Sequence, residues 1–293
     1  MAIRMLTRAE VQTAVDWAAG EGWNPGLRDA DAFFAADPEG FLGVERDGEL
    51  IGTISAVRYG DDYGFIGFYI MAEGHRMTID GIRLGQAGLA RLKGRRIGVD
   101  GVLAKAPQYA RLAGFRHAWQ NVRYQGPVAA VRRGGEGGTA PSLPPGLELR
   151  PAGELPFDQL VAYDAHHFGA RRDAFLREWI SLPGHQAWVC MATDGRRDAV
   201  RAFGVIRACR VGSKVGPLFA ADAVVAEALF RRLVSLAADG PIVLDTPDAN
   251  PAAVALAERY GMTPVFATAR MYSGGDPGLP LAAIFGVTSF ELG

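Results

Sequence analysis

The chain has 293 residues, a formal net charge of -1 and a hydrophobic fraction of 49%. These values predict a packed protein of one large or two ordinary domains, and they argue against nucleic acid or an anionic membrane as a main partner. Cys190 and Cys209 lie in apolar surroundings typical of buried thiols and not of a disulfide framework. The sequence has no apolar run long enough for a signal peptide or a membrane span, so we expect a soluble, cytoplasmic protein.

Two helices are predicted at the start of the chain. Thr7 is expected to be an N-cap, with Glu10 three residues later completing a capping box. Asp29 or Asp31 is expected to cap a second helix that ends near Ala36. Two strands follow at 41–44 and 50–57, and the Asp-Gly pair at 47–48 predicts the hairpin turn between them.

The loop between the two helices is rich in residues that break regular structure. It runs Glu-Gly-Trp-Asn-Pro-Gly from 21 to 26. We place Trp23 and Asn24 at the mouth of a substrate site. The alternative is that Trp23 folds back on the core.

The chain is organised around residues 63–93. Residues 65–71 are apolar and predict a buried strand, and the spacing of Ile82, Gln86 and Leu89 predicts a helix from Asp80 onward. A sharp strand-to-helix turn leaves the first backbone N–H groups of the helix free for an anion such as phosphate. Arg76 adds a charged donor at the same place. An ordinary turn of an α/β domain is the alternative.

This strand, loop and helix resemble the acetyl-CoA pyrophosphate loop of the GNAT acyltransferase superfamily, whose pattern is Arg-x-x-Gly-x-Gly. The matching residues are Arg76, Ile79 and Gly81, so Ile79 replaces the first glycine. Ile79 cannot adopt a positive φ cheaply. Asp80 is a candidate helix cap whose charge would repel a pyrophosphate. The resemblance implies that acetyl-CoA is the co-substrate and that it contacts the strand end and the loop, which comprise Phe68, Tyr69, Ile70, Met71, Arg76, Met77, Thr78, Ile79, Asp80, Gly81 and Ile82.

A second match to the family follows at residues 109–115, after a predicted short strand at 97–99. The run Tyr-Ala-Arg-Leu-Ala-Gly-Phe is similar to the family's Tyr-x-x-x-Gly-Phe signature, with one additional residue. The resemblance implies that Tyr109 protonates the departing CoA thiolate. The alternative is a tyrosine that packs its helix and exposes its hydroxyl.

The resemblance also implies direct attack of an amine on the thioester. Backbone N–H groups near Phe68 to Met71 would hold pantetheine and polarise the carbonyl. For the general base we name Glu73 and Asp100, which stand at strand ends. The alternative for each is a solvated or capping carboxylate.

A Gly- and Pro-rich segment divides the chain. We predict an N-terminal domain at 1–125, a linker at 126–147 and a C-terminal domain at 148–293. No set of residues has the spacing of a metal site, and Asp164, His166 and His167 are expected on a helix face at the domain interface.

The second half repeats the first element by element. Helices are predicted at 157–168 and 172–180, and strands at 186–191 and 199–208 with Asp-Gly at 194–195 between them. Asp222 is expected to cap the next helix, and Asp245 corresponds to Asp100. We therefore predict an α/β fold of two GNAT-like domains in tandem, each a mixed sheet flanked by helices. The whole chain resembles the tandem GNAT proteins of the YitH-like type.

The halves differ where the family's chemistry is expected. In the second half Ala257 stands where the tyrosine acid would be, the Arg-x-x-Gly-x-Gly pattern is missing, and Pro217 removes a backbone donor. We therefore predict an acyl-CoA-dependent N-acyltransferase with its chemistry in the first half, acting on the amine of a small molecule or amino-acid-like acceptor. The alternative is a non-catalytic tandem module that binds a metabolite or CoA. A homodimer is compatible with these observations.

Overall fold

The computed structural model describes residues 1–133, 143–193 and 200–293. The first half contains β1 (Ala2–Met5), α1 (Arg8–Gly20), α2 (Asp29–Ala36), β2 (Phe41–Arg46), β3 (Glu49–Tyr59), β4 (Tyr63–Met71), α3 (Ile79–Arg91), β5 (Arg96–Val102), α4 (Ala106–Ala113), β6 (Arg116–Pro127) and α5 (Val128–Arg132). The second contains β7 (Leu147–Pro151), α6 (Phe157–Phe168), α7 (Asp173–Ser181), β8 (His185–Ala192), β9 (Val200–Ala208), β10 (Ser213–Ala220), α8 (Ala223–Ser235), β11 (Pro241–Pro247), α9 (Pro251–Arg259), β12 (Thr263–Ser273) and β13 (Ile284–Gly286).

Several local predictions are confirmed. Thr7 and Glu10 form the capping box of α1, and Asp222 accepts a hydrogen bond from Val225 N as the cap of α8. Two other caps are wrong. The residue before α2 is Arg28, with Asp29 already inside the helix, and the N-cap of α3 is Thr78, with Asp80 in the first turn.

The predicted linker is only partly irregular. Residues 126–132 belong to the end of β6 and to α5, which extend the structure past the predicted boundary at 125. The predicted turn at 194–195 and the glycine run at 134–138 lie outside the described residues.

A single mixed sheet runs through both halves. Its order among the described residues is β1-β2-β3-β4-β5-β12-β6-β11-β10-β9-β8-β7, with β13 paired to β10. The halves therefore exchange strands: β12 of the second half lies against β5 of the first, and β6 of the first lies against β11 of the second. Each half is completed by a strand from the other, which makes the two halves one structural unit.

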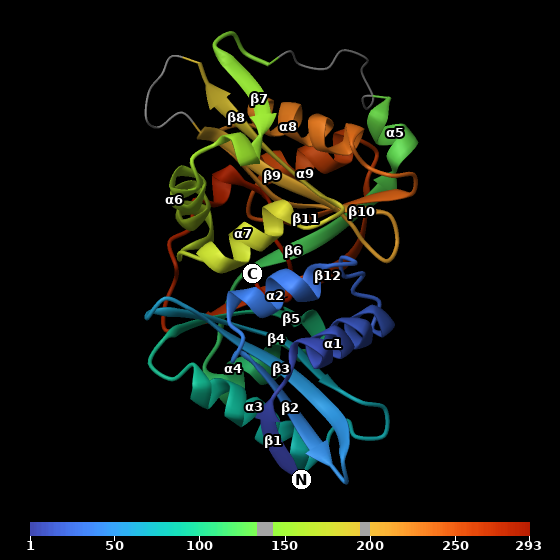
Figure 1. The fold of residues 1–293 in the computed structure, drawn as a ribbon, viewed down its shortest axis with the longest axis vertical. Helices are drawn as coiled ribbons and strands as arrows, with labels where there is room; N and C mark the ends of the chain where they lie inside the picture. Colours follow the sequence, from blue (N-terminus) through green and yellow to red (C-terminus); the bar gives the residue numbers. More distant parts are fainter. Residues whose placement is uncertain (134–142, 194–199) are drawn as a thin grey trace.

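Buried side chains form three layers around this sheet. One core lies between β2–β5 and the helices α3 and α4, and a second lies between β9–β11 and the helices α8 and α9. The third lies between the halves, where α1, α2, α6 and α7 meet and α2 packs against α7 (Figure 1). The face of the sheet between the halves is thus closed by four helices.

The exchanged strands carry matching ion pairs. Asp100 of β5 lies opposite Arg270 of β12, and Asp245 of β11 lies opposite Arg123 of β6. Both pairs are buried: Arg123 Nε donates to Asp245 Oδ1 over 2.7 Å, and Arg270 Nε donates to Asp100 Oδ2 over 3.1 Å. Because a buried carboxylate needs its partner, these pairs help to hold β12 beside β5 and β6 beside β11.

Candidate functional site

A gap opens between β4 and β5. These parallel strands pair only from Tyr63 and Arg96 to Ile66 and Val99. Beyond Ile66, β4 continues to Met71 while it pairs with β3, and β5 continues to Val102 while it pairs with β12. The edge of β4 from residue 67 to 71 is therefore free to pair with an extended ligand that enters between the strands.

A bulge in β4 lies inside this gap. The register with β3 shifts here, and Phe68 has a φ of 46°, which is strained for a non-glycine residue. The bulge is held from both sides: the buried Phe68 ring packs 5.7 Å from that of Phe33, and Thr53 Oγ1 donates to the Phe68 carbonyl over 2.9 Å. A strained backbone that is held this firmly is typical of functional sites.

Tyr109 on α4 lies against the other wall of the gap. Its ring covers Gly101 of β5 so closely that a Cβ there would lie 2.6 Å from a ring carbon. Burial raises the pKa of the Tyr109 hydroxyl, and nearby Tyr69 of β4 adds to the shift. The hydroxyl makes no hydrogen bond within the described part of the chain. It is therefore a neutral donor on the face of β5 that α4 covers, near Tyr69 of β4.

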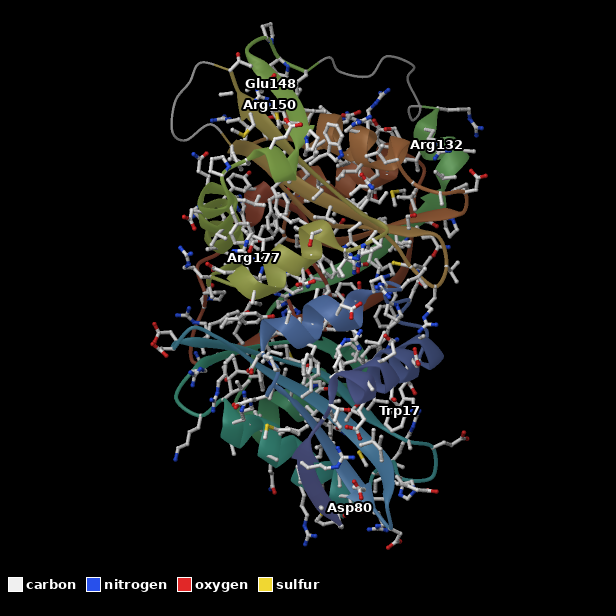
Figure 2. All side chains as sticks on the ribbon, viewed as in Figure 1. Trp17, Asp80, Arg132, Glu148, Arg150 and Arg177 are labelled. Atoms are coloured by element: carbon white, nitrogen blue, oxygen red, sulfur yellow. The ribbon has the colours of Figure 1, made fainter. Side chains whose placement is uncertain are left out.

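The N-terminus of α3 is open. Thr78, its N-cap, makes no side-chain cap and donates its hydroxyl to His75 O over 2.8 Å. Asp80, which we expected as the cap, is buried in the first turn and paired with Arg46, at the end of the molecule away from the second half (Figure 2). Among the described residues, the first N–H groups of α3 thus have no side-chain partner, and they can receive an anion.

The corresponding places in the second half are closed. The parallel strands β10 and β11 also pair over only three residues, but β13 enters beyond that point and pairs with β10. Val287 N donates to Asp245 O over 2.9 Å, which ties the same segment to β11. Asp222 caps α8, and Ala257 is buried where α4 carries Tyr109. The second gap is filled by the chain itself.

Each half of the chain is similar to a known protein family. The model of the acetyltransferase (GNAT) family matches residues 8–78, and that of an acetyltransferase (GNAT) domain matches residues 160–286. One family model thus falls on each half. The chain is a tandem GNAT acyltransferase.

Curated and solved relatives agree with this GNAT assignment. The holothin acyltransferase of Pseudoalteromonas sp. (strain SANK 73390) is 29% identical over 289 residues, covering 97% of this chain and 92% of that protein. A Pyrococcus horikoshii protein assigned as an acetyltransferase has the same fold, with a TM-score of 0.76, 18% identity, and coverage of 100% of this chain and 95% of that one. A tandem GNAT protein from the clavulanic acid biosynthesis pathway has a TM-score of 0.61 and 14% identity, over 94% and 99% of the two chains.

The family assignment decides between our two readings of the chain, in favour of an enzyme. GNAT enzymes use acetyl-CoA as co-substrate. The loop for its pyrophosphate departs from the family pattern. Arg76 forms an ion pair with Glu21 at the end of α1, Ile79 is 55% exposed, and Met77 is 98% exposed with a φ of 59°.

The two predicted bases occupy different surroundings in this GNAT fold. Glu73 is exposed in the turn after β4. The carboxylate of Asp100 is already engaged in hydrogen bonds. It accepts from Asn121 Nδ2 over 2.8 Å, from Thr268 Oγ1 over 3.1 Å, and from Arg270. The structure therefore places Asp100 as the anchor of the borrowed strand and not as a free base.

The loop with Trp23 and Asn24 is tied to the second half. Asn24 Nδ2 donates to Val211 O over 3.0 Å, and Val211 N donates to Asn24 Oδ1 over 2.9 Å. The Trp23 carbonyl accepts from Arg123, and its ring packs against the core between the halves. Trp23 thus folds back on the core, and the Asn24 amide is used in a contact between the halves.

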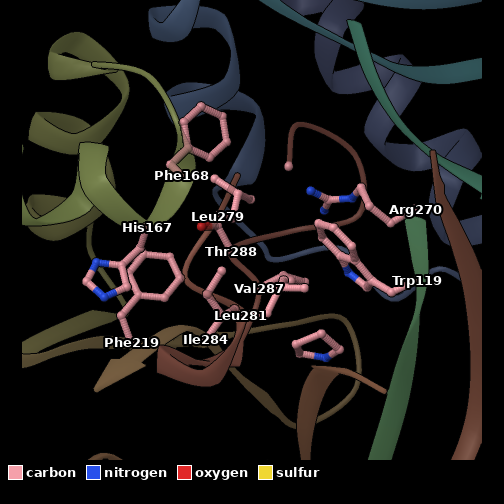
Figure 3. A pocket seen from close by; sticks show the side chains of 12 residues that line it. Trp119, His167, Phe168, Phe219, Arg270, Leu279, Leu281, Ile284, Val287 and Thr288 are labelled. Atoms are coloured by element: carbon pink, nitrogen blue, oxygen red, sulfur yellow. The ribbon is translucent and has the colours of Figure 1, made fainter. Parts of the chain in front are cut away.

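A small cavity lies where the halves meet (Figure 3). Its volume is about 20 Å³, enough for roughly one water molecule. Trp119 and Arg270 line one side, and His167 and Phe219, whose rings stack 4.8 Å apart, line the other. Arg270 also lies 5.0 Å from the ring centre of Phe65, so the cavity borders β4 on the face opposite α3. Sequence reasoning missed Arg270 because its position depends on the strand exchange.

Two buried charged groups also escaped the sequence analysis. Lys214 Nζ and both carboxylate oxygens of Glu291 have no hydrogen-bond partner among the described residues, at 1% and 2% exposure. Burial lowers the pKa of Lys214 and raises the pKa of Glu291, although Lys214 itself opposes the latter shift. The Glu291 backbone covers β4, since a Cβ on Gly67 would lie 1.9 Å from Glu291 O. The segment with Glu291 thus forms a wall at the bulge.

The described residues contain neither a metal-binding cluster nor a membrane-spanning helix. Within residues 1–133, 143–193 and 200–293, no group of three or more His, Cys, Asp or Glu side chains is arranged to hold a metal ion. No helix in these ranges combines the length and the apolar composition that a membrane crossing requires.

Proposed function

We propose that the first half transfers an acyl group from a pantetheine thioester, with acetyl-CoA as the simplest donor, to the amine of a small molecule. The observation that carries this proposal is the difference between the two gaps. The β4 edge is free beyond Ile66, whereas the β10 edge is paired with β13. Because pantetheine binds by adding to a strand edge, only the first gap can accept it.

The chemistry follows from the groups around the gap. A pantetheine arm pairs with β4 between 67 and 71, and backbone N–H groups at the Phe68 bulge polarise the thioester carbonyl. The neutral amine attacks this carbonyl, and the C–S bond breaks as the tetrahedral intermediate collapses. Tyr109 then gives its proton to the leaving thiolate. The proton that the nitrogen carries after it has added to the carbonyl passes to Glu73 or to solvent.

The acceptor reaches the thioester from the face opposite α3, between the halves. The cavity beside Trp119 and Arg270 borders this face of β4. Apolar side chains, both aliphatic and aromatic, predominate on its walls, which favours an apolar or aromatic amine. The similarity to a holothin acyltransferase along 97% of this chain supports a small-molecule acceptor.

The first test is a calorimetric titration of the purified protein with acetyl-CoA. We expect micromolar binding at one site per chain. A pair of variants then separates catalysis from binding: Tyr109→Phe should lower turnover about 100-fold or more and keep acetyl-CoA affinity. Tyr163→Phe, which removes a hydroxyl from the second half, is the matched control and should keep full activity.

Two results would contradict the proposal. The catalytic assignment fails if Tyr109→Phe is as active as the parent. The placement of the donor fails if Ile66→Trp, which narrows the point where β4 and β5 diverge, leaves acetyl-CoA binding unchanged in a protein that still unfolds cooperatively.

A further inference from the structure

An apolar rim surrounds the open end of the gap between β4 and β5. Six of the twelve large apolar side chains that are exposed in the described part of the chain lie at this end: Tyr69, Met77, Ile79, Ile82, Val102 and Leu103. Single exposed apolar residues are normal, but a group of them in one place indicates a surface that another molecule covers.

The topology brings these six residues together. Because β4 and β5 are parallel, their ends lie at the same edge of the sheet. Tyr69 lies near the end of β4 and donates its hydroxyl to Gly81 O of α3 over 2.7 Å, which ties the strand to the helix. Val102 ends β5 and Leu103 follows it. The rim therefore frames the entrance through which a pantetheine arm reaches the bulge.

Met77 is the most unusual member of the rim. It is 98% exposed, and its φ of 59° lies in the left-handed region that a methionine rarely adopts. Both features cost free energy in the isolated chain. A partner that buries the methionine side chain would offset part of that cost.

Basic side chains accompany the rim on α3 and α4. Arg83 lies on α3, and residues 103–113 carry Lys105 and Arg111 but no acid. The nearby acids are Glu73, exposed in the turn after β4, and Asp80, which is paired with Arg46. Arg83, Lys105 and Arg111 are exposed and form no ion pair with a described residue. An acidic partner is thus favoured at the same place as an apolar one.

The loop between β4 and α3 is poorly suited to the diphosphate of CoA. Ile79 replaces a glycine, Arg76 is held by Glu21, and Asp80 lies in the first turn of α3. Yet the deeper part of the gap, with the Phe68 bulge and Tyr109, is complete. The entrance fits a pantetheine arm that brings a single phosphodiester and an apolar, acidic surface.

We propose that the preferred acyl donor is a small acidic carrier protein that bears the acyl group on a 4′-phosphopantetheine arm and docks on this rim. This inference rests on the proposed function. The arm enters between β4 and β5, and the amine displaces the arm's thiol. The products are the amide and the free carrier thiol, so no further reactant is needed.

The experiment compares donors that carry the same acetyl group on different leaving thiols. The donors are an acidic acyl carrier protein charged on its phosphopantetheine, acetyl-CoA, and acetyl-pantetheine, with one aromatic amine as acceptor. We expect kcat/KM for the charged carrier protein to exceed that for acetyl-CoA at least tenfold. Raising the salt concentration should lower the carrier value more steeply than the acetyl-pantetheine value, because only the carrier contact is ionic.

Rim variants locate the contact. Leu103→Ser and Lys105→Glu should each lower kcat/KM for the carrier donor about tenfold and leave acetyl-pantetheine turnover unchanged. Val224→Ser, at an apolar side chain on α8 that is 42% exposed, is the matched control and should change neither value.

Two outcomes overturn the inference in distinguishable ways. Acetyl-CoA as the better donor, or rim variants that affect the three donors equally, would overturn carrier docking and leave acyl transfer intact. No transfer from any of the three donors would overturn both this inference and the proposed function.

Discussion

The two halves of this protein use the same order of elements to reach opposite results. In both, two parallel strands pair briefly and then separate. In the first half the space between them is walled by Tyr109 and left open to a ligand. In the second, β13 pairs with β10, Asp222 caps α8, and no tyrosine stands at Ala257. In the second half a single returning segment thus fills the space that stays open in the first.

The halves are alike where they hold each other together. Each lends a strand to the other, and each borrowed strand brings an arginine to a buried aspartate of its host. The comparison therefore separates two kinds of residue. Those at the strand exchange occur in both halves, whereas Tyr109 and the open strand edge beside it occur in the first half alone.

The largest effect is expected at the exchanged ion pairs. Asp245→Asn leaves Arg123 and Lys214 buried without their carboxylate, and Asp100→Asn leaves Arg270 alone. We expect each to lower the free energy of unfolding by about 3–5 kcal/mol, measured by chemical denaturation. Asp239→Asn, at a fully exposed carboxylate paired with Arg132, is the control. A loss below roughly 1 kcal/mol for both buried variants would contradict a role of the pairs in the exchange.

The next largest effect is a dependence of stability on pH that originates in the second half. β8 begins with His185, whose pKa burial lowers to about 4, whereas β2 begins with the apolar Phe41. Between pH 6.5 and 4 the unfolded chain binds a proton that the folded chain does not. Stability should therefore be complete above pH 6.5 and fall by about 3 kcal/mol as the pH approaches 4.

Replacing His185 by the phenylalanine that begins β2 tests whether His185 causes this loss of stability in acid. His185→Phe should flatten the dependence of unfolding free energy on pH between 6.5 and 4. If its slope equals that of the parent chain, other groups are responsible for the acid sensitivity.

A smaller effect is expected where the closing segment, residues 287–293, crosses β4 and β10 of the sheet. A Cβ on Gly67 would lie 1.9 Å from Glu291 O, and one on Gly216 would lie 2.7 Å from Thr288 O. Gly67→Ala and Gly216→Ala should each cost about 1–3 kcal/mol, with the larger cost at Gly67. Thermal unfolding would measure both. A larger loss of stability for Gly216→Ala than for Gly67→Ala would mean that residues 287–293 move aside more easily over β4 than over β10.

The smallest effect concerns the two helix N-termini. Asp222→Ala removes a cap and should cost about 1 kcal/mol. Thr78→Ala removes only the bond to His75 O and should cost less than half as much. Denaturant titration of both variants provides the measurement. Equal losses would show that α3 is already capped in solution and is less available to an anion.

The sequence alone determined the local features. Thr7 with Glu10, Asp222, the apolar run of β4 and the order of elements depend on residues within a few positions of each other, so their patterns could be read directly. The repeat of that order predicted two domains, and the missing tyrosine at Ala257 marked the second half as different. Tyr109 was found the same way, and its catalytic role remains a prediction.

Only the tertiary structure decided which strands are neighbours. β6 and β12 both place an arginine opposite a buried aspartate, so either strand fits either half and the sequence pattern cannot choose between them. That choice depends on contacts between residues far apart in the chain. It set the partners of Asp100, Asn24 and Arg270, put β13 into the second gap, and brought Lys214 and Glu291 into the interior. The gap between β4 and β5 stays open because β13 pairs with β10 in the second half and not with β4.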